Sequence, residues 1–202
     1  MEEHLRKSLI HVAKFYDQRK VGDVGNLGFR RSTDLTTLLG CVDRLLDEKI
    51  IDPGKTLFLD LGCADGRVNL FLSYLVRLSM GIEMDEWTLD EYAPLKHELE
   101  NYLKTKGLMS PPENTFFFHG DSMDEQVHEI IKRETGVAFE AFDLFYTYLI
   151  MHEEFARLIG ERAKRGSVFM VYGLQSVLPR YEGLRLLECS PVEGVLGCYR
   201  KV

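Results

Sequence analysis

The sequence predicts an α/β protein, a three-layer sandwich in which helices cover both faces of a mostly parallel seven-stranded sheet that ends in an antiparallel hairpin. Three observations lead to this prediction. Short apolar runs alternate with longer amphipathic segments along most of the chain, and clusters of glycine, proline and asparagine separate them. Near the C-terminus the alternation stops, and two strand-like runs flank a short turn. A chain of 202 residues has the length of one domain, or of one domain with a short extension.

Seven segments are expected to form the strands of this sheet. The first five are short apolar runs bounded by turn residues, the pattern of strands buried on both faces. The last two are separated by the five residues from Ser190 to Gly194, and we expect them to pair as an antiparallel hairpin. The expected strands are 56–61, 78–83, 115–119, 142–148, 168–172, 184–189 and 195–201.

The helices are expected where apolar residues recur at helical spacing. The first helix carries its apolar residues on one stripe, which favours packing against the domain. Ser32 or Thr33 can cap the second helix, and Pro94 interrupts the fourth helix early. The expected helices are 2–20, a second that starts near 33 and ends before 52, 68–76, 87–106, 127–133 and 153–164.

Charge and cysteine content limit the classes of function. The formal net charge of -7 argues against broad, phosphate-driven binding of DNA or RNA, so a nucleic-acid partner is not expected. The four cysteines include no C-x-x-C pair, and we expect no metal site. They are expected to be reduced, with a disulfide between Cys189 and Cys198 as the less favoured alternative. The acidic N-terminus and the lack of long apolar runs predict a soluble, cytoplasmic chain with no membrane partner. The oligomeric state is left open.

The main functional signal is the run from Asp60 to Gly66, Asp-Leu-Gly-Cys-Ala-Asp-Gly, which follows the first expected strand. Gly62 permits a sharp turn and Gly66 opens a helix, so a ligand can lie against the main chain there. Glu83 ends the next expected strand, about twenty residues further on, at the spacing of an acid that binds the two hydroxyls of a ribose. The pair therefore predicts a nucleoside-containing ligand at the carboxyl ends of the strands.

An oxidoreductase that uses a dinucleotide is the first alternative. Its G-x-G-x-x-G/A fingerprint would place Gly62, Ala64 and Arg67 in the three glycine positions, and arginine does not suit the third. Asp60 and Asp65 would also repel a pyrophosphate. A cationic ligand fits these acids better.

On these residues the chain resembles the class I, seven-stranded, Rossmann-like S-adenosylmethionine-dependent methyltransferases, from about Gly28 to Val202. The resemblance implies an enzyme that binds S-adenosyl-L-methionine. It places the methionine part on the Asp60–Gly66 loop, the ribose on Glu83 and the adenine beside Met84 and the start of the segment after the third strand. The implied cofactor-binding residues are Asp60, Gly62, Cys63, Ala64, Gly66, Glu83, Met84, Asp121 and Ser122.

The end of the fourth expected strand would face the transferred methyl group. Tyr146 is the candidate catalytic residue, either lining the acceptor channel or serving only as a core aromatic, and His152 is a less favoured candidate base. The sequence does not carry the Asn-Pro-Pro-Tyr motif of enzymes that methylate planar nitrogens. It faintly resembles seven-stranded protein-lysine methyltransferases, so the acceptor is left as a protein lysine or a small molecule. A non-catalytic relative that only binds the cofactor is a further alternative.

The N-terminal 33 residues are expected to form a unit distinct from the methyltransferase domain of residues 34–202. This unit comprises the first helix and a glycine-rich loop from Gly22 to Ser32, which would act as a cap or lid over the cofactor. Arg30 or Arg31 would there meet the ligand carboxylate, or both would be solvated surface residues.

Overall fold

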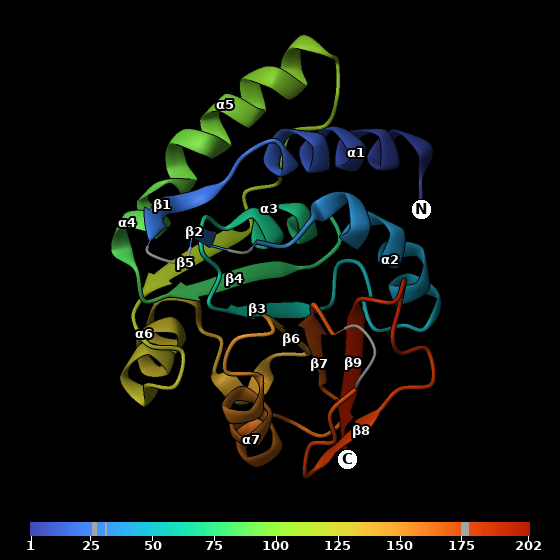
Figure 1. Ribbon diagram of the computed structural model, residues 1–202, viewed down its shortest axis with the longest axis vertical. Coiled ribbons are helices and arrows are strands. Elements are labelled where there is room, and N and C mark those ends of the chain that lie inside the picture. The colour runs from blue at the N-terminus through green and yellow to red at the C-terminus, as the bar shows by residue number, and fades with distance from the viewer. Residues whose placement is uncertain (26–27, 31, 175–177) are drawn as a thin grey trace.

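The computed structural model describes the chain except residues 26–27, 31 and 175–177, and for residues 22–25 and 28–30 it describes the backbone alone (Figure 1). Its centre is a seven-stranded sheet with the order β5-β4-β3-β6-β7-β9-β8. The first five of these strands in the chain run parallel, and β9 is antiparallel to both β7 and β8. The strands are β3 (Leu57–Leu61), β4 (Leu78–Glu83), β5 (Thr115–His119), β6 (Leu144–Tyr148), β7 (Val168–Tyr172), β8 (Leu184–Leu186) and β9 (Leu196–Lys201). The predicted fold class is therefore confirmed.

Helices cover both faces of this sheet (Figure 1). One face carries α1 (Glu3–Asp17), α2 (Leu35–Asp47), α3 (Arg67–Ser73) and α5 (Tyr92–Thr105). The other carries α6 (Glu125–Thr135) and α7 (His152–Arg162), while the short helix α4 (Glu86–Asp90) follows β4 at the sheet edge. Because β3, β4, β5 and β6 are each followed by a helix that returns along a face, their carboxyl ends meet at one edge. The strand order reverses beside β3, which is where such sheets bind ligands.

The core is divided into two layers by the sheet. Neighbouring strand residues point to opposite layers, so Phe58 packs with α1, α2 and α3 while Leu59 packs with α6 and α7. Leu9 and Val12 of α1 are fully buried in the first layer. The first helix thus packs on the domain, as its apolar stripe predicts.

The largest local difference from prediction is the Gly22–Ser32 segment. Its backbone forms a short antiparallel hairpin, β1 (Val21–Gly25) and β2 (Gly28–Arg30), where the three glycines predict a loop. Glycine disfavours strands by only about 1 kcal/mol, a cost that tertiary contacts override. Contacts between β1 and α4 provide such support.

The cap of α2 differs from prediction, while the early interruption that Pro94 predicts in the helix 87–106 is present. Asp34 is the residue that caps α2, through a hydrogen bond that its carboxylate accepts from Thr37 N at 2.6 Å. The hydroxyls of Ser32 and Thr33 are bonded elsewhere, so neither serves as the cap. The expected helix 87–106 is divided at Glu91 into α4 and α5, because Pro94 lacks the N–H that a continuous helix would need and favours a first turn.

The C-terminal hairpin is present with a longer connection than expected. β8 ends at Leu186 and β9 begins at Leu196, because the intervening residues form turns, including the Leu187–Ser190 turn. All four cysteines are free thiols, so the alternative of a Cys189–Cys198 disulfide is not seen.

Candidate functional site

The glycine loop starts where β3 ends and makes a sharp left-handed turn. Gly62 has φ +90°, and a Cβ added there would meet no atom within 4 Å. Its N–H and that of Cys63 both donate to the carbonyl of Ile82 at 2.9 Å, which holds the loop against β4. Only glycine adopts this φ without strain, and the space above it is open. A ligand can therefore lie directly on the backbone at Gly62.

Glu83, the last residue of β4, binds the same loop with its carboxylate. Oε2 accepts a hydrogen bond from Ala64 N and Oε1 accepts one from Asp85 N, both at 2.9 Å. The side chain is buried, and its two carboxylate oxygens bond backbone groups on both sides of the strand end. Glu83 therefore fixes the turn.

Asp60 lies one residue from the end of β3 with its side chain buried. Its Oδ1 has no hydrogen-bond partner among the described residues, and the residue is only 2% exposed. Burial first, and then the nearby carboxylates of Glu83 and Asp65, raise the pKa of Asp60 well above its usual range. A buried acceptor without a partner is costly, so this position is suited to a ligand that brings a donor or a positive charge.

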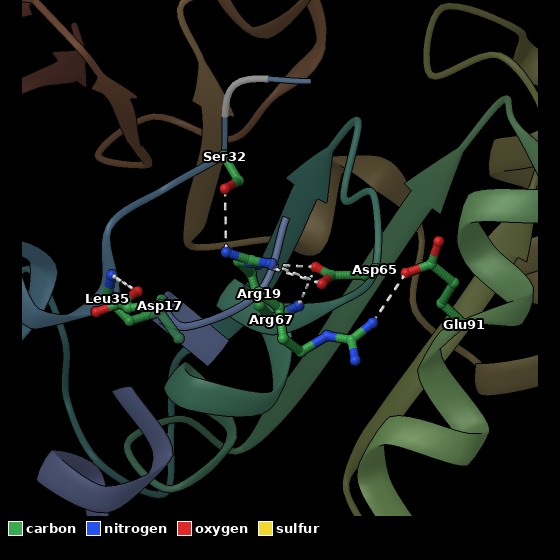
Figure 2. Close-up of polar contacts among 7 residues, drawn as sticks. All are labelled: Asp17, Arg19, Ser32, Leu35, Asp65, Arg67 and Glu91. Carbon is green, nitrogen blue, oxygen red and sulfur yellow. Dashed lines mark hydrogen bonds and ion pairs between the residues drawn. The ribbon is translucent and has the colours of Figure 1, made fainter. Parts of the chain in front are cut away.

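Asp65 has a different environment, because Arg67 neutralises it within the protein. Arg67 Nε lies 3.0 Å from Asp65 Oδ1, and Nη2 lies 2.9 Å from Oδ2, a two-pronged ion pair with both side chains buried. The guanidinium also lies 5.6 Å from the ring centre of Tyr16 in α1. The Arg67 side chain therefore points toward α1 and the hairpin (Figure 2).

The residues that follow the hairpin are bonded to this centre. Ser32 Oγ accepts a hydrogen bond from Arg67 Nη1 at 3.0 Å, as Figure 2 shows. Thr33 Oγ1 lies 2.5 Å from the phenol oxygen of Tyr146 on β6. Tyr146 is 1% exposed, and burial raises its pKa well above the usual range, so its phenol stays protonated at neutral pH. The Tyr146 phenol thus lies against Thr33, near the carboxyl end of β6.

The residues between the end of α1 and the hairpin are bonded to neighbouring helices. The carboxylate of Asp17 accepts hydrogen bonds from the backbone N–H groups of Leu35 and Thr36 at 2.8 and 2.9 Å. Arg19 Nη2 lies 3.4 Å from a carboxylate oxygen of Glu91 (Figure 2). Asp17 and Leu35 therefore close the segment that contains β1 and β2 at its base.

Gly66, Cys63 and Ala64 are placed mainly by packing. A Cβ at Gly66 would lie 2.5 Å from the Phe117 ring, so this glycine allows α3 to begin close to β5. Cys63 is buried and its sulfur would lie 2.6 Å from a Cβ at Gly81. Ala64 has φ +50°, which is a strained conformation for a residue with a side chain.

The predicted adenine residues lie at the ends of β4 and β5. The Met84 side chain is 64% exposed, and its carbonyl lies 3.0 Å from His119 Nε2. Asp121 is exposed and accepts a hydrogen bond from Met123 N at 2.8 Å. Ser122 is buried. These residues share the edge with Glu83 because β5 pairs with β4 in parallel register.

An exposed apolar segment follows β6 on the other side of β3. Ile150 is 68% exposed, and it stands between Leu149 and Met151, which both have positive φ. Thr147 Oγ1 lies 3.2 Å from the carbonyl oxygens of both Leu61 and Ile150, within reach of its single proton, and so links the segment to the end of β3. Strained, exposed apolar backbone of this kind is typical of a binding surface.

His152, the less favoured candidate base, is the first residue of α7. Its Nδ1 lies 2.7 Å from the hydroxyl of Tyr181.

The roles of Asp17, Ser32 and Thr33 were not predicted, because bonds to residues far along the chain leave no local pattern. The Arg67 pair did have a signal, an acid and a base two residues apart at a helix start. Arg31 lies outside the described residues, as does the Arg30 side chain, so their proposed ligand contact stays a prediction.

Among the described residues there is no group of three His, Cys, Asp or Glu side chains placed to hold a metal ion. In the same part of the chain, no helix has both the length and the apolar character needed to cross a bilayer.

Comparisons with known proteins match the fold and not the sequence. No protein-family model and no curated protein matches the chain. The rRNA methyltransferase AviRa from Streptomyces viridochromogenes matches with a TM-score of 0.58 at 13% identity, over 85% of this chain and 86% of that one. An RNA methyltransferase from Salinibacter ruber, in complex with S-adenosyl-L-homocysteine, matches with a TM-score of 0.51 at 16% identity, over 85% and 92%. The putative methyltransferase YhhF from Escherichia coli gives 0.51 and 16%, over 89% and 90%.

The strand order and these matches show that the chain has the Rossmann-like fold of the class I S-adenosylmethionine-dependent methyltransferases. At 13% to 16% identity the matches establish the fold alone, so the reaction has to be argued from the site.

Proposed function

We propose that this protein binds S-adenosyl-L-methionine at the carboxyl ends of β3 and β4 and transfers its methyl group to a nucleophile. The observation that carries the proposal is the buried Asp60 Oδ1, which has no hydrogen-bond partner among the described residues. It lies two residues before Gly62, whose backbone is open to a ligand. The ammonium group and sulfonium of S-adenosylmethionine would supply the missing donor and positive charge.

The charge of the site supports this ligand over a dinucleotide. Asp60 and Glu83 are acids within electrostatic reach of each other, and Arg67 neutralises the third acid, Asp65. A cation beside Asp60 would favour the charged form of its carboxyl group, whereas a pyrophosphate would be repelled by that charge. Of the two acids in the sequence argument against a dinucleotide, Asp60 keeps its part and Asp65 does not, because Asp65 is paired with Arg67.

Each predicted cofactor residue has a role in this proposal. Gly62 and Ala64 leave room for the methionine part, and Cys63 and Gly66 shape the loop by packing. Glu83 accepts hydrogen bonds from the ribose hydroxyls. The exposed Met84 side chain covers one face of the adenine, and Asp121 and Ser122 border its edge.

The chemistry requires positioning more than acid–base catalysis. When bound, S-adenosylmethionine supplies a methyl group that its positively charged sulfur already activates. The protein holds the acceptor in line and excludes water. Tyr146, whose protonated phenol contacts Thr33, packs against the methyl side of the proposed site. Its role as a catalytic residue stays a proposal. The exposed segment from Leu149 to Met151 is the proposed entrance for the acceptor.

A protein side chain or a small molecule is the proposed acceptor. The net charge of -7 and the acidic edge disfavour a polyanion. RNA is the second candidate, because two of the matched folds belong to RNA methyltransferases.

Two measurements test the proposal. Calorimetry with S-adenosylmethionine, S-adenosylhomocysteine and NAD should show binding of the first two and not the third; a folded protein that binds neither of the first two would overturn it. Methyl transfer from labelled S-adenosylmethionine to extract separated into protein, RNA and small-molecule fractions should label one fraction. Binding without any labelling would instead favour a non-catalytic cofactor-binding protein.

A further inference from the structure

We infer that Arg67 is a positioning residue, which ties the β1–β2 hairpin to the glycine loop through Ser32 and thereby increases affinity for the cofactor. The inference rests on the proposed function, because the benefit of the tie is expressed in cofactor binding. It starts from one geometric fact: Arg67 donates to Asp65 in the loop and to Ser32 after the hairpin at the same time.

The Asp65–Arg67 pair holds the guanidinium of Arg67 in one position. Both side chains are buried, and the guanidinium is fixed by two hydrogen-bonding prongs on one carboxylate. The Tyr16 ring, 5.6 Å away, limits its movement on the side of α1. With Nε and Nη2 committed to Asp65, Nη1 points in a defined direction, and Ser32 Oγ lies there at 3.0 Å.

Two other described anchors of the hairpin join it to other elements of the fold. Asp17 bonds the start of α2, and Thr33 bonds Tyr146 on β6. The Ser32–Arg67 bond connects the hairpin base with the loop that starts at Gly62. Since β1 also contacts α4, which follows Glu83, the hairpin spans from the methionine side of the proposed site to its nucleoside side.

The two effects are linked thermodynamically. If an ordered hairpin raises affinity for the ligand, then the bound ligand must order the hairpin by the same factor. Loss of the Ser32 hydroxyl should therefore lower both the order of the hairpin in the free protein and the affinity for the ligand. A purely structural role of Arg67 would alter stability and leave this coupling unchanged.

The test uses Ser32→Ala in the full chain, because removing Arg67 would leave Asp65 buried and unpaired. Hydrogen exchange of residues 21–30 is followed with and without S-adenosylhomocysteine, together with its Kd. Ser32→Ala should increase hairpin exchange several-fold in the free protein and raise Kd by a similar factor. Ser32→Thr, which keeps the hydroxyl, should restore both.

Thr36→Ala is the matched control. It also removes one hydroxyl bonded to a charged side chain at the base of the hairpin, here Asp17, without touching the loop. It should leave the Kd unchanged. If Ser32→Ala leaves either hairpin exchange or Kd at the wild-type value, or if Thr36→Ala raises Kd equally, the inference is wrong. Failure of the wild type to bind S-adenosylhomocysteine would instead reject the proposed function.

Discussion

The carboxylate of Glu83 accepts a hydrogen bond from the backbone N–H of Ala64 at 2.9 Å, which fastens the end of β4 to the turn that follows β3. The same acid occupies the position expected to bind a ribose. It therefore joins two roles, because the group that would recognise the ligand also holds the loop on which the ligand would lie.

This double role gives a graded prediction for Glu83. Glu83→Ala removes the acceptor for Ala64 N as well as any ribose bonds, whereas Glu83→Gln keeps one oxygen that can accept from the loop. Hydrogen bonds to a charged group contribute about 1.5–3 kcal/mol each, so both variants should weaken S-adenosylhomocysteine binding about tenfold or more. Only Glu83→Ala should also lower the melting temperature clearly. An unchanged Kd in Glu83→Gln would argue against the ribose role.

The two glycines of the loop should respond differently to alanine. Gly62→Ala strains a left-handed backbone, at a cost of about 1–2 kcal/mol, but its Cβ enters open space. Gly66→Ala adds an overlap with Phe117 at 2.5 Å and should cost about 2–5 kcal/mol in all.

Urea unfolding and calorimetry separate the two effects. Gly62→Ala should fold and bind S-adenosylhomocysteine weakly, with Gly62→Val weaker still, while Gly66→Ala should show mainly lost stability. Equal Kd values for wild type, Gly62→Ala and Gly62→Val would mean that the loop does not touch the ligand.

Asp60 predicts a pH-dependent stability. Burial, followed by Glu83 and Asp65, raises its folded-state pKa above the unfolded value of about 4. Between those two values the folded chain keeps a proton that the unfolded chain releases, so the stability from this group falls as pH rises through the window. Each unit of pKa difference corresponds to about 1.4 kcal/mol.

The comparison of wild type with Asp60→Asn isolates this group. Asparagine does not titrate, so its free energy of unfolding relative to wild type should increase from pH 4 upward. The variant should at the same time bind S-adenosylmethionine poorly, because asparagine cannot ionise to pair with the cation. Unfolding curves that stay parallel from pH 4 to 8 would show that Asp60 does not carry the raised pKa.

Cys189 is expected to be the most reactive thiol. A hydrogen bond from the Cys198 thiol is the main cause that lowers the pKa of Cys189 to about 6, so it is mostly thiolate at pH 7. Cys41, Cys63 and Cys198 are buried.

Mass spectrometry after brief treatment with iodoacetamide at pH 7 should find one label, at Cys189. Cys189→Ser should take up none in the same time. Labelling of Cys41, whose pKa burial raises to about 12, at an equal rate would contradict the assignment.

The sequence alone determined the sheet and predicted where a ligand would lie. Apolar runs between breakers identify buried strands, and β4, β5 and β7 start and end where the pattern predicts. The Asp60–Gly66 loop and Glu83 could be paired from spacing, because parallel strands bring their carboxyl ends to one edge. These features depend on neighbours in sequence or on a general rule of chain connection.

Only the tertiary structure decided how the N-terminal segment is held. The glycines from Gly22 to Gly28 predict a loop, yet their backbone pairs as a hairpin, and Asp17, Ser32 and Thr33 fasten it to groups that are distant in sequence. Asp60 and Asp65 are both buried, but Arg67 pairs with Asp65 while an oxygen of Asp60 has no described partner. The burial of both acids and the long-range hydrogen bonds of the hairpin depend on which segments the fold brings together, so the sequence alone does not give them.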